Sequence, residues 1–233
     1  MKGSVNSIET FGLLDGPGIR TVIFLNGCKL RCLYCHNPET WIMQNLNYTA
    51  EEIANIVIKN KPYFTNGGGV TFSGGEPLLQ SDFIIEICKI LKKENIHIAL
   101  DTAGCGNGNY DEILKYIDLV ILDIKAVKED EYKYITGRDM SSFNEFKNKI
   151  IELNKNVWIR QVIVPNINDD KKHIDLLKEY VKQFKNLEKI ELLPYHTSGV
   201  SKYDRLNIPY KLKDIADMDK NKCDELYNYL KES

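Results

Sequence analysis

The 233-residue sequence lacks the long apolar segments of membrane proteins. No run approaches the roughly 18 apolar residues of a membrane span, and residues 1–6 lack the apolar core of a signal peptide. An excess of charge of one sign is also missing, since 31 basic and 33 acidic residues give a net charge of −2. These absences argue against a nucleic-acid or membrane partner, and we expect a cytoplasmic protein.

Cysteine is scarce and shows no paired spacing typical of a disulfide framework. The sequence has six cysteines, which in a reducing compartment favours metal or redox use. Cys88, Cys105 and Cys223 stand alone, in contexts that suit a helix, a loop and a C-terminal helix, and we expect Cys88 in the core. Low-complexity segments and interdomain linkers are absent, so the 43% hydrophobic content predicts one domain over residues 1–233.

The other three cysteines form the strongest motif. Cys28, Cys32 and Cys35 have the spacing C-x3-C-x2-C. An electron-transfer cluster of the cubane type normally has four cysteine ligands, so three thiolates would leave one iron open to a substrate or cofactor. A zinc site that includes His36 is the alternative, but structural zinc sites usually take ligands in two well-separated pairs. The motif favours cluster chemistry performed on a bound molecule.

Apolar, β-prone runs alternate with segments of helical periodicity along the chain. This alternation implies right-handed βαβ units and a parallel sheet. Six units suit an open, partial (β/α)6 barrel better than a closed eight-stranded one. Thr49 and Glu52 form a capping box before the first expected helix. The expected helices cover residues 52–58, 83–91, 143–153 and 174–184, and the expected strands cover 21–25, 70–72, 96–100, 119–122, 157–164 and 190–193.

Polar clusters follow these strands at their carboxyl ends. In parallel α/β folds those ends share one face, where loops assemble active sites. We therefore expect the active site on that face. The clusters are the cysteine loop, Gly74-Gly75-Glu76, Asp101-Thr102, Asp123-Ile124-Lys125 and His196.

The second cluster suits close contact with a ligand. Gly74 and Gly75 would let backbone groups approach it, and Glu76 offers a carboxylate to a ligand ammonium. The same residue types also make ordinary turns. His196 has an equally plain alternative, because a lone histidine is more often a satisfied loop residue than a functional one.

The charged residues at strand ends need partners. Asp101 and Asp123 end apolar strands, where a carboxylate is costly unless it is paired or bound to a cation. Lys125 could be the ion-pair partner of these carboxylates or could reach a ligand carboxylate. Arg160 lies within an apolar strand, where a guanidinium needs an anionic or hydrogen-bonding partner. Together the clusters indicate a pocket for a zwitterionic ligand beside an iron-sulfur cluster.

With Tyr34 before its last cysteine, the motif resembles that of the radical S-adenosylmethionine (SAM) enzymes. Further matches occur in order between about Ser7 and His196 and resemble the activating enzymes of glycyl radical enzymes. No cysteine lies between Cys35 and Gly74, so the ferredoxin-like insert of many such activases is missing. This favours pyruvate formate-lyase as the partner, with anaerobic ribonucleotide reductase as the alternative. The matching segments are residues 15–20, 32–37, 67–76, 122–125, 157–160 and 189–196.

The resemblance implies that Cys28, Cys32 and Cys35 hold a [4Fe-4S] cluster whose open iron binds SAM. It also implies that the backbone of Tyr34, Cys35 and His36 lies against the adenine and that the methionyl ammonium is received by Gly74, Gly75 and Glu76. Other parts of the cofactor would contact Asp123, Ile124, Lys125 and His196, and a monovalent cation would be bound by Asp101, Thr102, the Ile121 carbonyl and Asp123. The target glycine loop would contact Asp15 and Arg160.

The reaction implied is reductive cleavage of SAM with an electron from a flavodoxin or ferredoxin. The resulting 5'-deoxyadenosyl radical would abstract hydrogen from a glycine of the partner, and the family suggests a monomer. Two alternatives stay open: a radical SAM enzyme acting on a small molecule, and a metal or electron-carrier module without catalysis. Only the enzymatic hypotheses predict cleavage of SAM.

Overall fold

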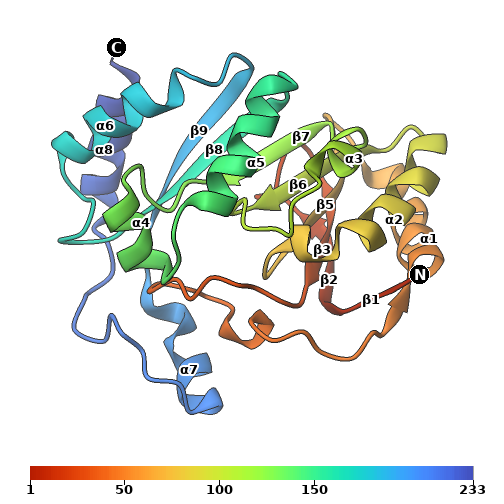
Figure 1. Ribbon diagram of the computed structural model, residues 1–233, viewed down its shortest axis with the longest axis horizontal. Coiled ribbons are helices and arrows are strands. Elements are labelled where there is room, and N and C mark those ends of the chain that lie inside the picture. Colours follow the sequence, from red (N-terminus) through yellow and green to blue (C-terminus); the bar gives the residue numbers. More distant parts are fainter. Residues whose placement is uncertain (233) are drawn as a thin grey trace.

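A computed structural model describes residues 1–232, which form one open sheet surrounded by helices (Figure 1). The sheet has seven strands in the order β2-β3-β5-β6-β7-β8-β9. Strands β3 to β9 pair in parallel, and β2 pairs antiparallel with β3. The bounds are β2 Val5–Gly12, β3 Arg20–Leu25, β5 Gly69–Gly74, β6 His97–Thr102, β7 Leu119–Asp123, β8 Asn156–Ile163 and β9 Leu187–Pro194; a separate pair joins β1 Lys2–Gly3 to β4 Tyr48–Thr49.

The predicted α/β fold with a parallel, partial barrel is confirmed, and all six expected strands are present. The edge strand β2 was not expected from the sequence. Its interior residues alternate between exposed and half-buried, with Asn6, Ser7 and Glu9 on it. An antiparallel edge strand can face water and therefore lacks the apolar run that marks a buried parallel strand.

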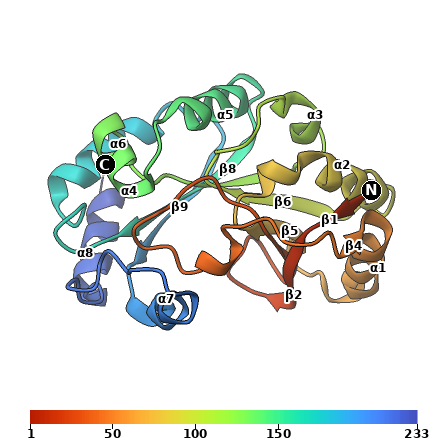
Figure 2. The ribbon, with the colours of Figure 1, turned by 60° about the horizontal axis from the view of Figure 1, so that its bottom comes forward.

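Helices cover the sheet. Figure 2 shows α2, α3 and α5 along one side of it and α7 on the opposite side. The capping box at Thr49 is confirmed, because the side chains of Thr49 and Glu52 each accept a hydrogen bond from the other residue's backbone amide. Cys88 is fully buried in α2, as expected. The helices are α1 Ala50–Asn60, α2 Ser81–Lys93, α3 Tyr110–Leu114, α4 Glu129–Thr136, α5 Ser141–Glu152, α6 Lys171–Val181, α7 Val200–Leu206 and α8 Lys220–Lys231, with 3-10 turns η1 Pro38–Thr40, η2 Lys61–Tyr63, η3 Pro77–Gln80 and η4 Thr197–Gly199.

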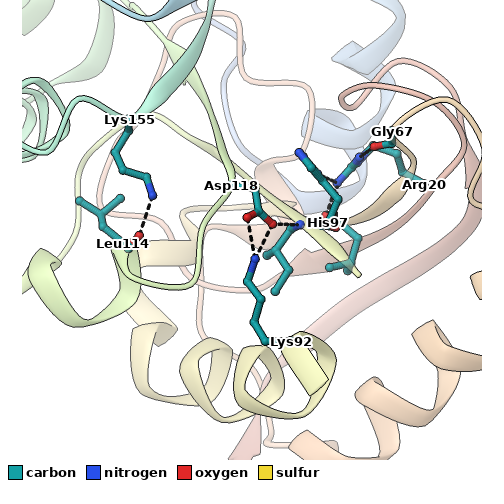
Figure 3. A network of polar contacts seen from close by, with 9 residues as sticks. Arg20, Gly67, Lys92, His97, Leu114, Asp118 and Lys155 are labelled. Carbon is teal, nitrogen blue, oxygen red and sulfur yellow. Dashed lines mark hydrogen bonds and ion pairs between the residues drawn. The ribbon is translucent and has the colours of Figure 1, made fainter. Parts of the chain in front are cut away.

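A polar network closes the amino ends of the strands (Figure 3). Arg20 is fully buried at the start of β3 and donates to Thr71 Oγ1 at 2.6 Å and to the carbonyls of Pro17, Gly67 and Val70. Asp118 accepts from Lys92 Nζ and from the Ile98 amide. Because these ends are filled by protein groups, the carboxyl ends are left for the site.

None of the helices formed by residues 1–232 combines the length and the apolar character that crossing a bilayer demands.

Candidate active site

A cavity of about 260 Å³ lies at the carboxyl ends of the parallel strands. The loop after β3 forms one wall, and the ends of β5, β6, β7 and β9 form the others. The structure thus gathers in one place most residues that the sequence singled out. Those lining the cavity are Cys28, Cys32, Tyr34, Cys35, His36, Gly74, Gly75, Asp101, Thr102, Asp123, Lys125 and His196.

Backbone hydrogen bonds fix the cysteine loop. The amides of Arg31 and Leu33 donate to the carbonyls of Thr136 and Ile135 at the end of α4, at 2.8 and 2.9 Å. From the other side, Tyr203 Oη of α7 donates to the carbonyl of Cys35 at 2.9 Å. The loop is therefore clamped between two elements that are distant in sequence.

Burial dominates the electrostatics of the three thiols. It raises the pKa of Cys32 to about 12, although the Lys125 ammonium opposes the shift. Burial likewise raises the pKa values of Cys28 and Cys35. Thiols in this environment stay protonated at neutral pH unless a metal stabilises the thiolates.

The donor set fits a cluster with three thiolate ligands, because these three cysteines face a common cavity that has room for further groups. Across residues 1–232, no three or more His, Cys, Asp and Glu side chains converge in a group that could hold one metal ion. The geometry therefore gives no support to the zinc alternative. The His36 ring instead donates through Nε2 to the His196 carbonyl at 2.9 Å.

The two glycines at the end of β5 are required by close backbone packing. Gly74 has a φ of +111°, and a Cβ there would lie 2.2 Å from the Leu25 amide nitrogen. A Cβ on Gly75 would lie 2.3 Å from the Gly27 carbonyl oxygen. A side chain at Gly74 would push away β3, and one at Gly75 would push away the start of the cysteine loop.

Glu76 lies beneath the cavity wall. Its side chain is fully buried and is not part of the cavity lining. The carboxylate accepts hydrogen bonds from Thr102 Oγ1 at 2.5 Å and from the amides of Leu78, Ala103 and Cys105. Burial raises its pKa, and these bonds oppose the shift. In this structure the carboxylate therefore binds the loop after β6, and its contact with a ligand ammonium stays a prediction.

Asp123 and Lys125 form an ion pair in the cavity wall. Burial opposes the charge on Lys125, but the Asp123 carboxylate outweighs it and raises the lysine pKa well above its ordinary value. The Lys125 ammonium also lies 5.3 Å from the centre of the Tyr34 ring. Lys125 is thus the partner that the half-buried Asp123 required.

The expected cation ligands each contact another protein group. Asp101 accepts from Ser73 Oγ at 2.7 Å and lies 3.9 Å from the Arg160 guanidinium. Thr102 donates to Glu76, and Asp123 pairs with Lys125. All three line the same cavity, and a cation bound by them stays a prediction.

Arg160 and Asp15 lie outside the cavity lining. Arg160 donates to Glu191 Oε2 at 2.7 Å and to the carbonyl of Leu14, so it holds the loop that carries Asp15. Burial raises the pKa of Asp15, and the positive charge of Arg160 opposes the shift. Ile124 is also outside the lining; it is fully buried and its amide donates to the Arg160 carbonyl.

His36 and His196 meet edge to face, with ring centres 4.0 Å apart. Burial lowers the pKa of His36, which favours its neutral form. His196 Nδ1 contacts Ser198 Oγ at 2.7 Å. Both rings are thus oriented by protein contacts.

Several lining residues were not among the predicted site residues. Ser73 and Ala103 adjoin selected residues, so their place at a strand end was a usable signal. Tyr203, which holds the cysteine loop from outside the lining, gave no such signal. The additional lining residues are Leu30, Asn37, Trp41, Ser73, Ala103, Val162, Leu193, Pro194 and Tyr195.

Comparison with known proteins adds an independent observation. The sequence profile of the Radical SAM superfamily matches residues 22–177. The chain is 55% identical over 232 residues to the pyruvate formate-lyase-activating enzyme of Clostridium pasteurianum, covering 99% of this chain and 98% of that protein. It is 42% identical over 240 residues to the enzyme of the same name from Staphylococcus epidermidis, covering 99% and 96%.

Solved structures share the fold. Streptococcus suis SuiB bound to the precursor peptide SuiA aligns with a TM-score of 0.68 and 17% identity, over 97% of this chain and 47% of that one. A domain of a pyruvate-formate lyase-activating enzyme from Bacteroides vulgatus aligns with a TM-score of 0.57 and 24% identity, over 71% and 94%. The motif, the cavity and the extent of the sequence match agree, and the chain belongs to the Radical SAM superfamily.

Proposed function

We propose that this chain is the activating enzyme of pyruvate formate-lyase and installs a glycyl radical on that partner. The observation that carries the proposal is that three cysteines line one cavity in a chain that matches named activating enzymes over its whole length. A bound [4Fe-4S] cluster would supply the electron that cleaves SAM to methionine and a 5'-deoxyadenosyl radical, which abstracts hydrogen from a glycine of the partner.

In this proposal Cys28, Cys32 and Cys35 hold the cluster. Their loop is anchored to α4 and α7, so the three sulfurs keep fixed positions. Leu30 packs beside Cys32 in the adjoining apolar cluster and limits access of water to the thiolates. A dry and rigid site of this kind orients the reacting groups and excludes other hydrogen donors.

The remaining wall of the cavity would bind SAM. The backbone of Gly74 and Gly75 lines the cavity, so its carbonyls can accept from the methionyl ammonium. The backbone of Tyr34, Cys35 and His36 would face the adenine. Asp123, Lys125 and His196 would contact other parts of the molecule, with Ile124 contributing through its backbone. Glu76 would receive the same ammonium and would also fix the loop that holds Thr102.

The target glycine would enter beside Asp15 and Arg160. Support comes from the position of the Arg160 guanidinium, which lies 3.9 Å from Asp101 of the cavity wall and also binds the Leu14 carbonyl. These groups therefore connect the cavity with the loop before β3. In the proposal they contact the backbone of the glycine loop.

The remaining proposals concern a bound cation, the electron donor, the cellular compartment and the oligomeric state. A monovalent cation at Asp101, Thr102 and Asp123 could take Asp123 Oδ1, which has no hydrogen-bond partner, while Lys125 stays on Oδ2. SAM affinity should then depend on the potassium concentration. A flavodoxin or ferredoxin would donate the electron. We also propose a cytoplasmic monomer made of one domain.

A pair of matched cysteine variants tests the assignment. Cys32→Ala removes a proposed cluster ligand, whereas Cys88→Ala removes a buried thiol in α2. After anaerobic reconstitution, Cys32→Ala should lose the cluster's iron and sulfide and produce no 5'-deoxyadenosine, while Cys88→Ala should retain both. Cleavage of SAM by Cys32→Ala would overturn the proposal. If the wild type cleaves SAM but forms no radical on pyruvate formate-lyase, its substrate would instead be another glycyl radical enzyme, such as anaerobic ribonucleotide reductase, or a small molecule.

A further inference from the structure

We infer that Trp41 is a positioning residue for the proposed cluster, whose indole N–H donates to the Cys35 sulfur and thereby favours the reduced state of the cluster that this sulfur would hold. The inference deepens the proposed function and rests on it, because it requires a cluster at Cys28, Cys32 and Cys35. Trp41 lies outside the cysteine motif and lines the same cavity.

The backbone of Trp41 is tied to the start of the cysteine loop. Trp41 follows the turn η1, and its amide donates to the Pro38 carbonyl at 3.1 Å. Its carbonyl accepts from the Cys28 amide at 3.1 Å, and the preceding carbonyl, of Thr40, accepts from the Gly27 amide at 2.7 Å. The segment that follows the third cysteine therefore turns back onto the first, and these bonds fix the position of Trp41.

Two side chains hold the indole ring. The guanidinium carbon of Arg31 lies 4.8 Å from the ring centre, a cation–π contact, and the ring of Tyr203 meets the indole edge to face at 5.8 Å between centres. Arg31 also donates to the carbonyls of Cys28 and Leu30, both at 2.7 Å. Since Arg31 and Tyr203 both bind the backbone of the cysteine loop, the ring is held in register with that loop.

The Trp41 side chain reaches the Cys35 thiol. Both residues line the cavity, and Trp41 is half-buried. Burial raises the pKa of Cys35, and hydrogen bonds from the Asn37 backbone and the Trp41 side chain oppose this rise. The indole N–H is the only hydrogen-bonding group of a tryptophan side chain, and it can only donate. Trp41 thus directs an uncharged donor at one of the three proposed ligand sulfurs.

A donor at this sulfur would ease reduction of the cluster. Reduction adds one negative charge, part of which the ligand sulfurs carry, so an N–H group stabilises the reduced form more than the oxidised form. The electron comes from the one-electron carrier of the proposed function, which is oxidised as the cluster is reduced. No covalent bond is formed or broken, and no proton moves. Trp41 would therefore act on the reduction potential through Cys35, without contacting the substrate.

The test replaces the indole N–H by an atom that cannot donate. The chain has two tryptophans, so in a Trp158→Phe protein β-(3-benzothienyl)alanine supplied in place of tryptophan enters at position 41 alone and exchanges N–H for sulfur in a ring of nearly the same shape. Trp158→Phe is also the matched control for Trp41→Phe, because Trp158 lies on β8 outside the cavity lining and its Nε1 donates to Glu188 Oε2 at 3.2 Å. The midpoint potential of each reconstituted protein is measured by an anaerobic redox titration followed by electron paramagnetic resonance.

We expect the benzothienyl protein to favour the oxidised cluster about fivefold more than its Trp158→Phe parent does, which appears as a lower midpoint. Trp41→Phe should shift in the same direction, and Trp158→Phe should keep the wild-type midpoint. Equal midpoints of the benzothienyl protein and its parent, both with full iron and sulfide, would overturn the inference and leave the proposed function intact. Failure of both Trp41 variants to hold a cluster would also overturn it, because Trp41 would then serve assembly instead. A wild type that holds no cluster would overturn the inference and the proposed function together.

Discussion

The hydroxyl of Thr102 donates a hydrogen bond to the buried carboxylate of Glu76 at 2.5 Å, which joins the loop after β5 to the end of β6. The carboxylate also accepts hydrogen bonds from the amides of Ala103 and Cys105. Replacing Glu76 by Gln would place an amide NH₂ among these donors. We predict that Glu76→Gln lowers the free energy of unfolding by about 2 kcal/mol in a urea titration.

Glu51→Gln is the control for this change, because Glu51 is exposed in the first turn of α1. Its unfolding free energy should stay close to that of the wild type. If Glu76→Gln kept full stability but lost SAM affinity, the carboxylate would contact the ligand directly and the structural role argued for it would be wrong.

Tyr203 holds the cysteine loop through its bond to the Cys35 carbonyl. Tyr203→Phe removes the hydroxyl and leaves a buried carbonyl without this donor, so we predict a loss of about 1 kcal/mol in stability. Iron should also be released faster to a chelator, because the loop can move. Tyr63→Phe, at a position 51% exposed, serves as the control. Identical release rates for the two variants would contradict the clamp.

Arg20 supports the opposite end of the barrel. Its guanidinium donates to several acceptors at once, including Thr71 Oγ1 and the Val70 carbonyl. A lysine ammonium is compact and cannot reach them all, so Arg20→Lys should cost about 3 kcal/mol in chemical denaturation. Arg205→Lys, at an exposed residue of α7, should change little. A stability loss of the same small size in both variants would show that the network contributes nothing.

His173 should make stability depend on pH. Its ring is buried and hydrogen-bonded to Gln161 Oε1 at 2.9 Å, and burial lowers its pKa below the ordinary value of 6.5. The folded state thus resists protonation, so this contribution is complete above pH 6.5 and is lost as the pH falls. Between about pH 7.5 and about pH 5.5 we expect unfolding free energy to decrease less steeply in His173→Gln than in the wild type. Equal slopes would exclude this role of His173.

Most of the parallel strands were predictable because they are buried on both faces and form nearly continuous apolar runs, as in residues 119–122. The edge strand β9 is largely exposed and showed only the short run at residues 190–193. The edge strand β2 carries Asn6 and Glu9 and gives no such signal. Helix α4, with Lys133 and Tyr134 exposed, has too narrow an apolar stripe to stand out. Burial on both faces, rather than strand propensity, decided which elements could be found.

Residues of the site could be predicted where they lie at the carboxyl end of a strand. Asp123 and Lys125 follow β7 and could be assigned to the cavity from topology alone. The bond of Tyr203 to Cys35 spans 168 residues of sequence, and that of Thr102 to Glu76 spans 26. No local pattern encodes such partners, so the supporting contacts required the three-dimensional structure.

Anaerobic electron paramagnetic resonance of the reduced, reconstituted protein mixed with SAM and pyruvate formate-lyase tests the account most directly, with 5'-deoxyadenosine quantified in the same tube. We predict a glycyl radical doublet that appears together with 5'-deoxyadenosine and is absent in Cys32→Ala. Formation of neither product by a protein that holds its full complement of iron and sulfide would contradict the account.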